Sequence, residues 1–134
     1  MKDEERLMTT AIKAMKRAYA PYSKFPVGAA ILDETDSIHA GANIENAAYP
    51  VGNCAEASAI AAMVMAGGAR IRMIAVAGGD GVRLCTPCGA CRQRIREFGD
   101  AGTPILVGGP EGLQRRFTLG ELLPESFGPE NLAD

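Results

Sequence analysis

The sequence predicts an α/β fold: a single domain over residues 1–134, with a mixed central β-sheet inside a three-layer α/β/α arrangement. Three features support this prediction. Residues 71–109 read as strand, helix and strand, residues 27–44 as two apolar runs around a polar turn, and the N-terminal segment as an amphipathic helix. A chain of 134 residues can also bury a hydrophobic core without disulfides.

The elements follow from local patterns. Residues 4–19 place apolar side chains on one stripe, which predicts an amphipathic helix that stops before Pro21. The apolar runs 27–32 and 38–44 flank the polar segment "DETDS", which predicts a β-hairpin. Residues 55–66 are apolar nearly all round, so this helix is expected to be buried within the domain or against a neighbouring subunit.

The second half of the chain predicts a βαβ unit. Residues 71–79 and 104–109 read as buried strands, and residues 88–98 between them as a helix. Residues 113–124 then read as a short strand and a short helix, followed by a tail.

Composition excludes several functional classes. With 14 Lys and Arg against 16 Asp and Glu, the chain has no positive excess for a nucleic acid polymer. Its longest apolar stretch, residues 59–66, is far shorter than the roughly 20 residues of a membrane span. The charged start "MKDEER" is unlike a secretory signal, so we expect a cytoplasmic protein.

The four cysteines indicate a metal site or catalysis. Cys88 and Cys91 would share one face of the first turn of a helix. Cys54 would begin the other buried helix, whose exposed N–H groups and dipole are expected to lower the pKa of its thiol. Pro87 favours an extended Thr86, so Cys85 should lie off the face that carries the other two.

The number of thiolate ligands separates two kinds of zinc site. Three thiolates and an open position make a catalytic zinc, and four make a structural one. Glu56, in the first turn after Cys54, favours catalysis, because a carboxylate beside the metal can relay protons. Other interpretations stay open at this point: a C-x-x-C pair is often structural or redox-active, and a first-turn Glu is a common helix preference. An iron–sulfur site would require a fourth cysteine soon after Cys91.

Several motifs together resemble the zinc-dependent cytidine deaminases of the small, homotetrameric type. They are "YAPYSKFPVGAA", "NIENAAYP", "NCAE", "PCGACRQ" and "LLPESF", in the order of that family and over nearly the whole chain. The pairing of "CAE" with "PCGAC" is the zinc deaminase signature. The resemblance implies the cytidine deaminase-like fold and one Zn²⁺ per subunit.

The resemblance also assigns residues. Cys54, Cys88 and Cys91 would bind zinc, and Glu56 would be the proton shuttle. The implied substrate-binding residues are Phe25 for the base pocket, Asn43 and Glu45 for the ribose hydroxyls, Ala55, and, across a subunit boundary, Tyr49 and Phe127. Asn43 and Glu45 would also project from one face of a strand, where an amide and a carboxylate can bind a diol.

The implied reaction is hydrolytic deamination of cytidine and 2′-deoxycytidine at C4 of the base, which yields uridine or 2′-deoxyuridine and ammonia and serves pyrimidine salvage. Two alternatives remain. One is a deaminase for another aminopyrimidine nucleoside such as blasticidin S, and the other is an inactive, zinc-stabilised nucleoside-binding protein.

One position departs from the family pattern. Many relatives carry Arg directly after the Glu of "CAE", where it donates to the zinc-bound sulfurs, and this chain has Ala57. We expect N–H groups at the helix starts of Cys54 and Cys88 to offset most of the negative charge instead.

Overall fold

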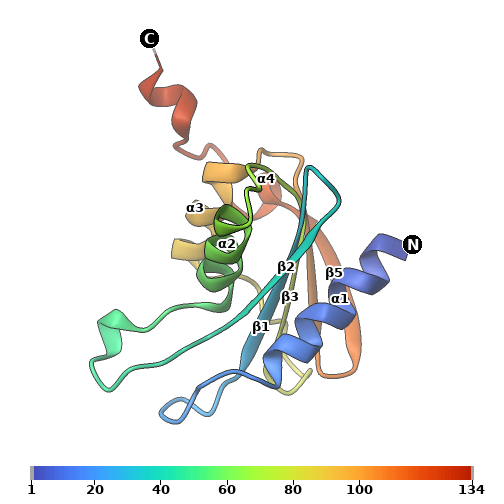
Figure 1. Cartoon of the computed structure of the whole chain (residues 1–134), viewed down its shortest axis with the longest axis vertical. Coiled ribbons are helices and arrows are strands. Elements are labelled where there is room, and N and C mark those ends of the chain that lie inside the picture. The colour runs from blue at the N-terminus through green and yellow to red at the C-terminus, as the bar shows by residue number, and fades with distance from the viewer. Residues whose placement is uncertain (1, 134) are drawn as a thin grey trace.

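The computed structural model describes residues 2–133 and contains a five-stranded sheet in the order β2-β1-β3-β4-β5 (Figure 1). The strands are β1 (Val27–Asp33), β2 (Ile38–Ala42), β3 (Ile71–Gly78), β4 (Pro104–Gly109) and β5 (Gly112–Thr118). Strand β1 pairs antiparallel with β2 and β3, β3 pairs parallel with β4, and β4 pairs antiparallel with β5. The predicted hairpin, βαβ unit and mixed sheet are therefore confirmed.

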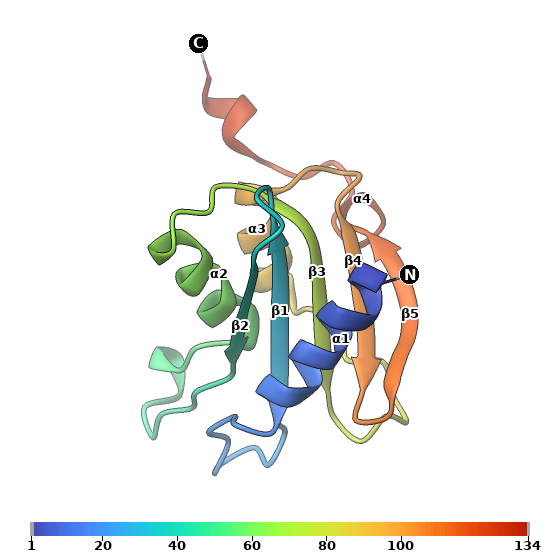
Figure 2. The ribbon, with the colours of Figure 1, turned by 45° about the vertical axis from the view of Figure 1, so that its right-hand side comes forward.

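Helices cover both faces of this sheet (Figure 2). They are α1 (Lys2–Met15), α2 (Ala55–Met65), α3 (Gly89–Phe98) and the short α4 (Leu119–Leu122), with 3-10 turns η1 (Tyr49–Val51) and η2 (Pro129–Leu132). Helix α1 crosses one face, and α2 and α3 lie on the other. This is the predicted three-layer α/β/α arrangement.

The core divides at the sheet because successive strand residues point to opposite faces. In β1, Ala29 and Ile31 pack with α2 and α3, whereas Ala30 and Leu32 pack with α1. Strand β1 is buried along nearly its whole length. The continuous apolar run that predicted a strand at 27–32 is therefore a strand covered on both faces.

Most predicted boundaries agree with the structure within one residue, and the larger differences lie in the first helix, in β2 and in the tail. The first helix ends at Met15 rather than Tyr19, because Tyr19 leaves the helix to pair with the segment after β2: its N–H donates to Asn43 O at 2.9 Å, and its carbonyl accepts from Glu45 N at 2.8 Å. Strand β2 ends at Ala42 rather than at residue 44. The predicted tail contains the turn η2.

Gly41 allows α2 to approach β2 closely. A Cβ at this position would overlap the backbone of Ser58 and Ala59 in α2. The close contact matters for the site, because Cys54 and Glu56 lie at the start of the same helix.

Candidate active site and metal centre

Three cysteines meet where the N-terminal ends of α2 and α3 come together. Cys54 is the N-cap of α2, Cys88 is the N-cap of α3, and Cys91 lies in the first turn of α3. Their sulfur atoms all lie within 4.8 Å of one another. The structure thus brings together the three predicted ligands from two separate segments of the chain.

The cluster fits a zinc ion. Zinc–sulfur bonds are about 2.3 Å long, so two sulfurs on one tetrahedral zinc lie roughly 3.8 Å apart. This separation is below the 4.8 Å within which the three sulfurs lie. The exposure of the three thiols differs, with Cys91 fully buried, Cys54 half-buried and Cys88 exposed. A ligand set that is closed on the core side and open on the other leaves room for a further ligand.

Burial controls the pKa values of the thiols. Burial raises the pKa of Cys54 and of Cys91, and for Cys91 the negative charge of Glu56 adds to this effect. At Cys88, burial is outweighed by hydrogen bonds, first from the Cys91 N–H, and the pKa is lowered. The expectation that the pKa of the Cys54 thiol is lowered is wrong, because desolvation by burial raises it.

Cys85 lies outside the cluster, as its position before Pro87 predicted. Its sulfur packs against Gly78, where a Cβ would reach it, and its side chain borders the apolar core. Burial, with a smaller contribution from the charge of Glu56, raises its pKa to about 11. Cys85 is therefore a protonated core thiol.

Glu56 follows Cys54 by two residues and is only 4% exposed. Burial raises the pKa of its carboxyl group. Hydrogen bonds with its own backbone N–H and with Cys91, and to a smaller extent the positive charge of Arg94, oppose this rise. The charge of Glu56 in turn acts on all four cysteines. A buried carboxyl group beside a three-thiol cluster is the arrangement expected for proton transfer at a metal.

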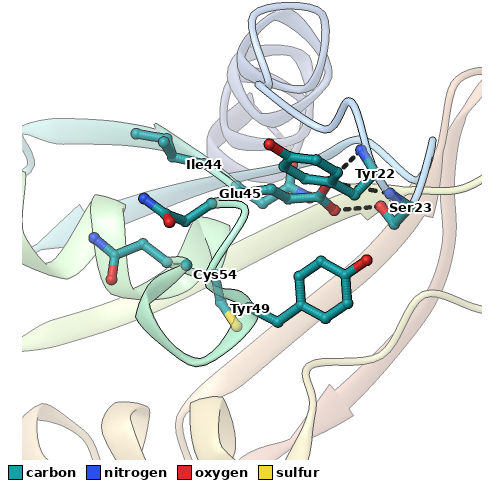
Figure 3. Close-up of a pocket in the computed structure, with 10 residues that line it drawn as sticks. Tyr22, Ser23, Ile44, Glu45, Tyr49 and Cys54 are labelled. Carbon is teal, nitrogen blue, oxygen red and sulfur yellow. Dashed lines mark hydrogen bonds between the residues drawn. The ribbon is translucent and has the colours of Figure 1, made fainter.

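A cavity of about 400 Å³ opens beside Cys54 (Figure 3). Its lining consists of Tyr22, Ser23, Asn43, Ile44, Glu45, Asn46, Tyr49, Gly52, Asn53 and Cys54. The rings of Tyr22 and Tyr49 lie 5.9 Å apart between their centroids. The cavity has the size of a small-molecule site, with two aromatic rings, three side-chain amides and one carboxylate in its wall.

Asn43 and Glu45 both bind the segment that follows α1. Asn43 accepts a hydrogen bond from Val27 N at 2.9 Å through Oδ1, and donates to Phe25 O at 2.9 Å through Nδ2. Glu45 accepts from the Ser23 hydroxyl, and from Tyr22 N and Ser23 N at 2.9 and 3.1 Å. These bonds, first that from the Ser23 hydroxyl, lower the pKa of Glu45.

The other predicted substrate-binding residues lie in different places. Phe25 does not line this cavity but packs beside Gly79, in an adjacent hollow with Arg83 and Leu84. Ala55 is fully buried, and Tyr49 is 75% exposed at the cavity rim. Phe127 is more than half exposed, and its carbonyl accepts from Gln93 Nε2 at 2.8 Å.

Sequence reasoning missed Arg94, Tyr22 and Ser23. Arg94 Nη1 donates to Cys91 Sγ at 3.4 Å. Arg94 follows Cys91 by three residues on one helix, and this spacing could have predicted the contact between their side chains. The hydrogen bonds from Tyr22 and Ser23 to Glu45 join residues far apart in the sequence, so no local pattern predicts them.

We expected N–H groups at the helix starts of Cys54 and Cys88 to offset the negative charge of the three thiolates. The structure confirms this only in part. Neither Cys54 nor Cys88 accepts a capping hydrogen bond through its side chain. The Cys91 N–H does lower the pKa of Cys88, but at Cys54 burial prevails. The direct hydrogen bond from a cation to a cluster sulfur comes from Arg94.

Within residues 2–133, every helix is too short or too polar to cross a membrane.

The chain is similar to known proteins whose family has a zinc-binding region, in agreement with the three-cysteine cluster. The model of the cytidine and deoxycytidylate deaminase zinc-binding region matches residues 1–107. The chain is 43% identical to a cytidine deaminase of Sporosarcina psychrophila over 98% of this chain and 96% of that protein. It is 42% identical to one of Halalkalibacterium halodurans, over 98% and 99% of the two chains.

Solved structures show the same similarity. The crystal structure of cytidine deaminase from Burkholderia pseudomallei aligns with a TM-score of 0.85 and 38% identity, over 91% of this chain and 97% of that one. The crystal structure of the Mycobacterium tuberculosis cytidine deaminase aligns with a TM-score of 0.80 and 37% identity, over 92% and 95%.

Proposed function

The chain belongs to the cytidine and deoxycytidylate deaminase zinc-binding family, and from this membership we propose that it deaminates cytidine and 2′-deoxycytidine hydrolytically. The products are uridine or 2′-deoxyuridine and ammonia. One observation carries the proposal: a three-thiol cluster lies beside a buried carboxyl group at the edge of a cavity of small-molecule size.

Cys54, Cys88 and Cys91 would hold one Zn²⁺ per subunit as thiolates. When bound, zinc supplies the Lewis acidity that makes a water molecule nucleophilic at neutral pH. The two N-cap positions and the first turn of α3 would supply the three sulfurs.

Glu56 would move the protons of the reaction. Its carboxylate accepts a proton from the attacking water and gives it to N3 of the cytosine ring as the oxygen bonds to C4. It then takes the hydroxyl proton from that oxygen and gives it to the amino group, so the C4–N bond breaks and ammonia leaves. Burial of Glu56 supports this role, because it keeps bulk water away from the proton transfers.

Asn43 and Glu45 would bind the ribose. The amide of Asn43 has two N–H donors and two acceptor lone pairs, and the loop 25–27 occupies one of each. Glu45 accepts three hydrogen bonds from Tyr22 and Ser23, which leaves acceptor capacity for a sugar hydroxyl. Both groups are also fixed in orientation by these contacts, which reduces the entropy lost on binding.

Two further residues would serve the base, although neither lines the cavity. Ala55 is buried between the ligand Cys54 and the proton shuttle Glu56, and Phe25 lines a separate hollow; we assign both to the base side of the site. Tyr49 would close the cavity from its exposed rim.

We assign a homotetramer in which a neighbouring subunit completes each site, with Phe127 and Tyr49 near the boundary. Exposed apolar side chains support an assembly. They include Ile44, Tyr49, Val51, Val64, Met65 and Phe127. The last two residues of α2, Val64 and Met65, are 48% and 85% exposed. This exposure fits a helix whose apolar surface is larger than one subunit buries.

A cytoplasmic location completes the proposal. The site needs three reduced cysteines, and a reducing compartment keeps thiols free for a metal.

A substrate panel tests the proposed reaction. Zinc-loaded protein is incubated with cytidine, 2′-deoxycytidine, cytosine and blasticidin S, while released ammonia and ultraviolet absorbance are followed. We expect ammonia from the first two compounds and none after zinc is removed. Ammonia from blasticidin S alone would indicate the other nucleoside deaminase, and binding of cytidine without ammonia would indicate an inactive binding protein.

A further inference from the structure

The metal centre carries a charge that its ligands do not balance. A divalent zinc with three thiolates has a formal charge of minus one. Ligand thiols lose their protons when a metal binds, so binding turns three neutral thiols into an anionic centre. Cys91 and Glu56 are buried and Cys88 is exposed, so water screens this charge poorly on the core side of the centre only.

Arg94 is a cation that faces this centre. It lies three residues after Cys91 on α3, so both side chains lie on the same side of the helix. Its Nη1 donates to Cys91 Sγ at 3.4 Å. The residue after Glu56 is Ala57, whose side chain has no donor. Within residues 2–133, no other lysine or arginine side chain donates a hydrogen bond to a cluster sulfur.

We propose that Arg94 is a positioning residue of the metal centre, whose guanidinium offsets the negative charge of the three thiolates and thereby helps the protein to retain zinc. The inference rests on the proposed zinc site, and it does not depend on which nucleoside is the substrate. The guanidinium also holds Cys91 in orientation, because a hydrogen bond to sulfur restricts the torsion of its side chain.

One further observation agrees with this assignment. Arg94 is itself exposed on the surface of α3, so a substitution there changes charge at the site with little effect on the core. A residue that serves packing would be buried instead.

The test measures zinc retention by the holoenzyme. Zinc-loaded wild type, Arg94→Gln and Arg94→Lys are mixed with an excess of a chromogenic chelator, and the rate of zinc transfer is recorded. Arg17→Gln is the matched control: it removes the same charge from an exposed arginine whose side chain makes no hydrogen bond or ion pair with any residue in the described range 2–133.

We expect Arg94→Gln to release zinc at least about tenfold faster than wild type, the usual scale for loss of a partner that hydrogen-bonds a metal ligand. Arg94→Lys keeps the charge and is expected to stay within about threefold of wild type. Arg17→Gln should equal wild type.

Two results would overturn the proposal. One is zinc release from Arg94→Gln within twofold of Arg17→Gln. The other is equal release from Arg94→Lys and Arg94→Gln, which would show that packing by the arginine, and not its charge, retains the metal. If Arg94→Gln does not fold, Arg94→Met, which also removes the charge, takes its place and is compared with Arg17→Met by the same criterion. Because the readout is metal transfer, a protein that holds zinc but does not deaminate cytidine would contradict the proposed function and leave this inference standing.

Discussion

Cys85, Cys88 and Cys91 follow one another at intervals of three residues, yet two of them join the cluster and one does not. Pro87 explains the difference, because it keeps the preceding residue out of a helical conformation. Helix α3 therefore begins after Pro87, with Cys88 as its N-cap, and Cys85 packs against Gly78 instead.

This difference gives a prediction for two cysteine variants. Cys85→Ser should retain about one zinc per chain, because Cys85 supplies no ligand. Cys88→Ser should lose zinc, because two thiolates remain. Metal analysis after gel filtration measures both. Loss of zinc from Cys85→Ser would instead indicate a closed four-thiolate site.

Ser23 gives a second prediction at the scale of one residue. Its hydroxyl and N–H bind the Glu45 carboxylate, which we assign to the ribose. Ser23→Ala removes the hydroxyl contact and loosens Glu45, so the KM for cytidine should rise about fivefold, equivalent to the roughly 1 kcal/mol of one hydrogen bond. The kcat should change little, because Glu45 does not contact the reacting atoms. A fall in kcat at constant KM would contradict the ribose assignment.

At the scale of elements, helix α2 connects the sheet to the site. It packs on β2 at Gly41 and carries Cys54 and Glu56 at its start. The position of the metal ligand thus depends on how closely a helix backbone approaches a strand.

Gly41→Ala should therefore weaken both the fold and the site. The added Cβ overlaps the backbone of α2, so the helix must move or the strand must shift. We expect a loss of about 1–3 kcal/mol in the free energy of unfolding, typical of overpacking, together with faster zinc release. Gly102→Ala is the control, because its Cβ meets only Asp100 at an ordinary contact distance. Equal stability of the two variants would contradict the close packing of α2 on β2.

The turn between β1 and β2 contains a buried carboxylate. Asp33 is 2% exposed and accepts hydrogen bonds from Thr35 N at 2.8 Å, Ser37 N at 3.1 Å and the Thr35 hydroxyl at 2.7 Å. His39 Nε2 lies 2.7 Å from its other oxygen. Burial opposes ionisation, but the contacts with His39 and Thr35 prevail and lower the pKa of Asp33 far below its usual value.

A depressed carboxyl pKa stabilises the fold above the pKa of the unfolded chain, and this stability is lost as the pH falls towards the folded pKa. Asp33→Asn should therefore cost about 2 kcal/mol at pH 7, the scale of hydrogen bonds to a charged group. The difference from wild type should shrink as the pH falls from about 5 to about 2. Urea unfolding across that range measures it, with the exposed Glu111→Gln as control. A difference that stays constant with pH would contradict the role of the charge.

At the scale of the whole molecule, the two core clusters lie on opposite faces of one sheet, and we propose that residues 1–134 form one domain. The C-terminal segment extends away from this body (Figure 1). It is held to α3 by Arg96, which contacts Ser126 and Glu130, and by Gln93. An extended segment that ends in exposed apolar residues fits contact with another subunit.

The assembly gives a prediction of mass and of activity. Light scattering should give about 56 kDa, four times the 14.0 kDa of the chain. Phe127→Ala should lower kcat/KM for cytidine without loss of zinc, because the residue would serve a neighbouring pocket. A monomer with full activity would contradict shared active sites.

Local patterns predicted much of this molecule. Apolar periodicity predicted the strands and helices, and the spacing of Cys88 and Cys91 at a helix start predicted two adjacent ligands. Joining Cys54 to them needed the resemblance to a family, since no local rule brings two helices together. The long-range contacts were missed: Tyr19 pairs beyond α1, and Arg94 reaches Cys91 through a long side chain whose direction the sequence does not reveal.

The central claim is that Glu56 transfers protons beside a zinc held by three thiolates. The most direct test is the rate of ammonia release from cytidine by wild type and Glu56→Gln at equal zinc content, with the exposed Glu97→Gln as control. We predict a loss of about 10²–10⁴-fold or more in kcat for Glu56→Gln, the range of general acid–base catalysis, with zinc retained and the control unchanged. Turnover by Glu56→Gln within a few-fold of wild type would contradict the account.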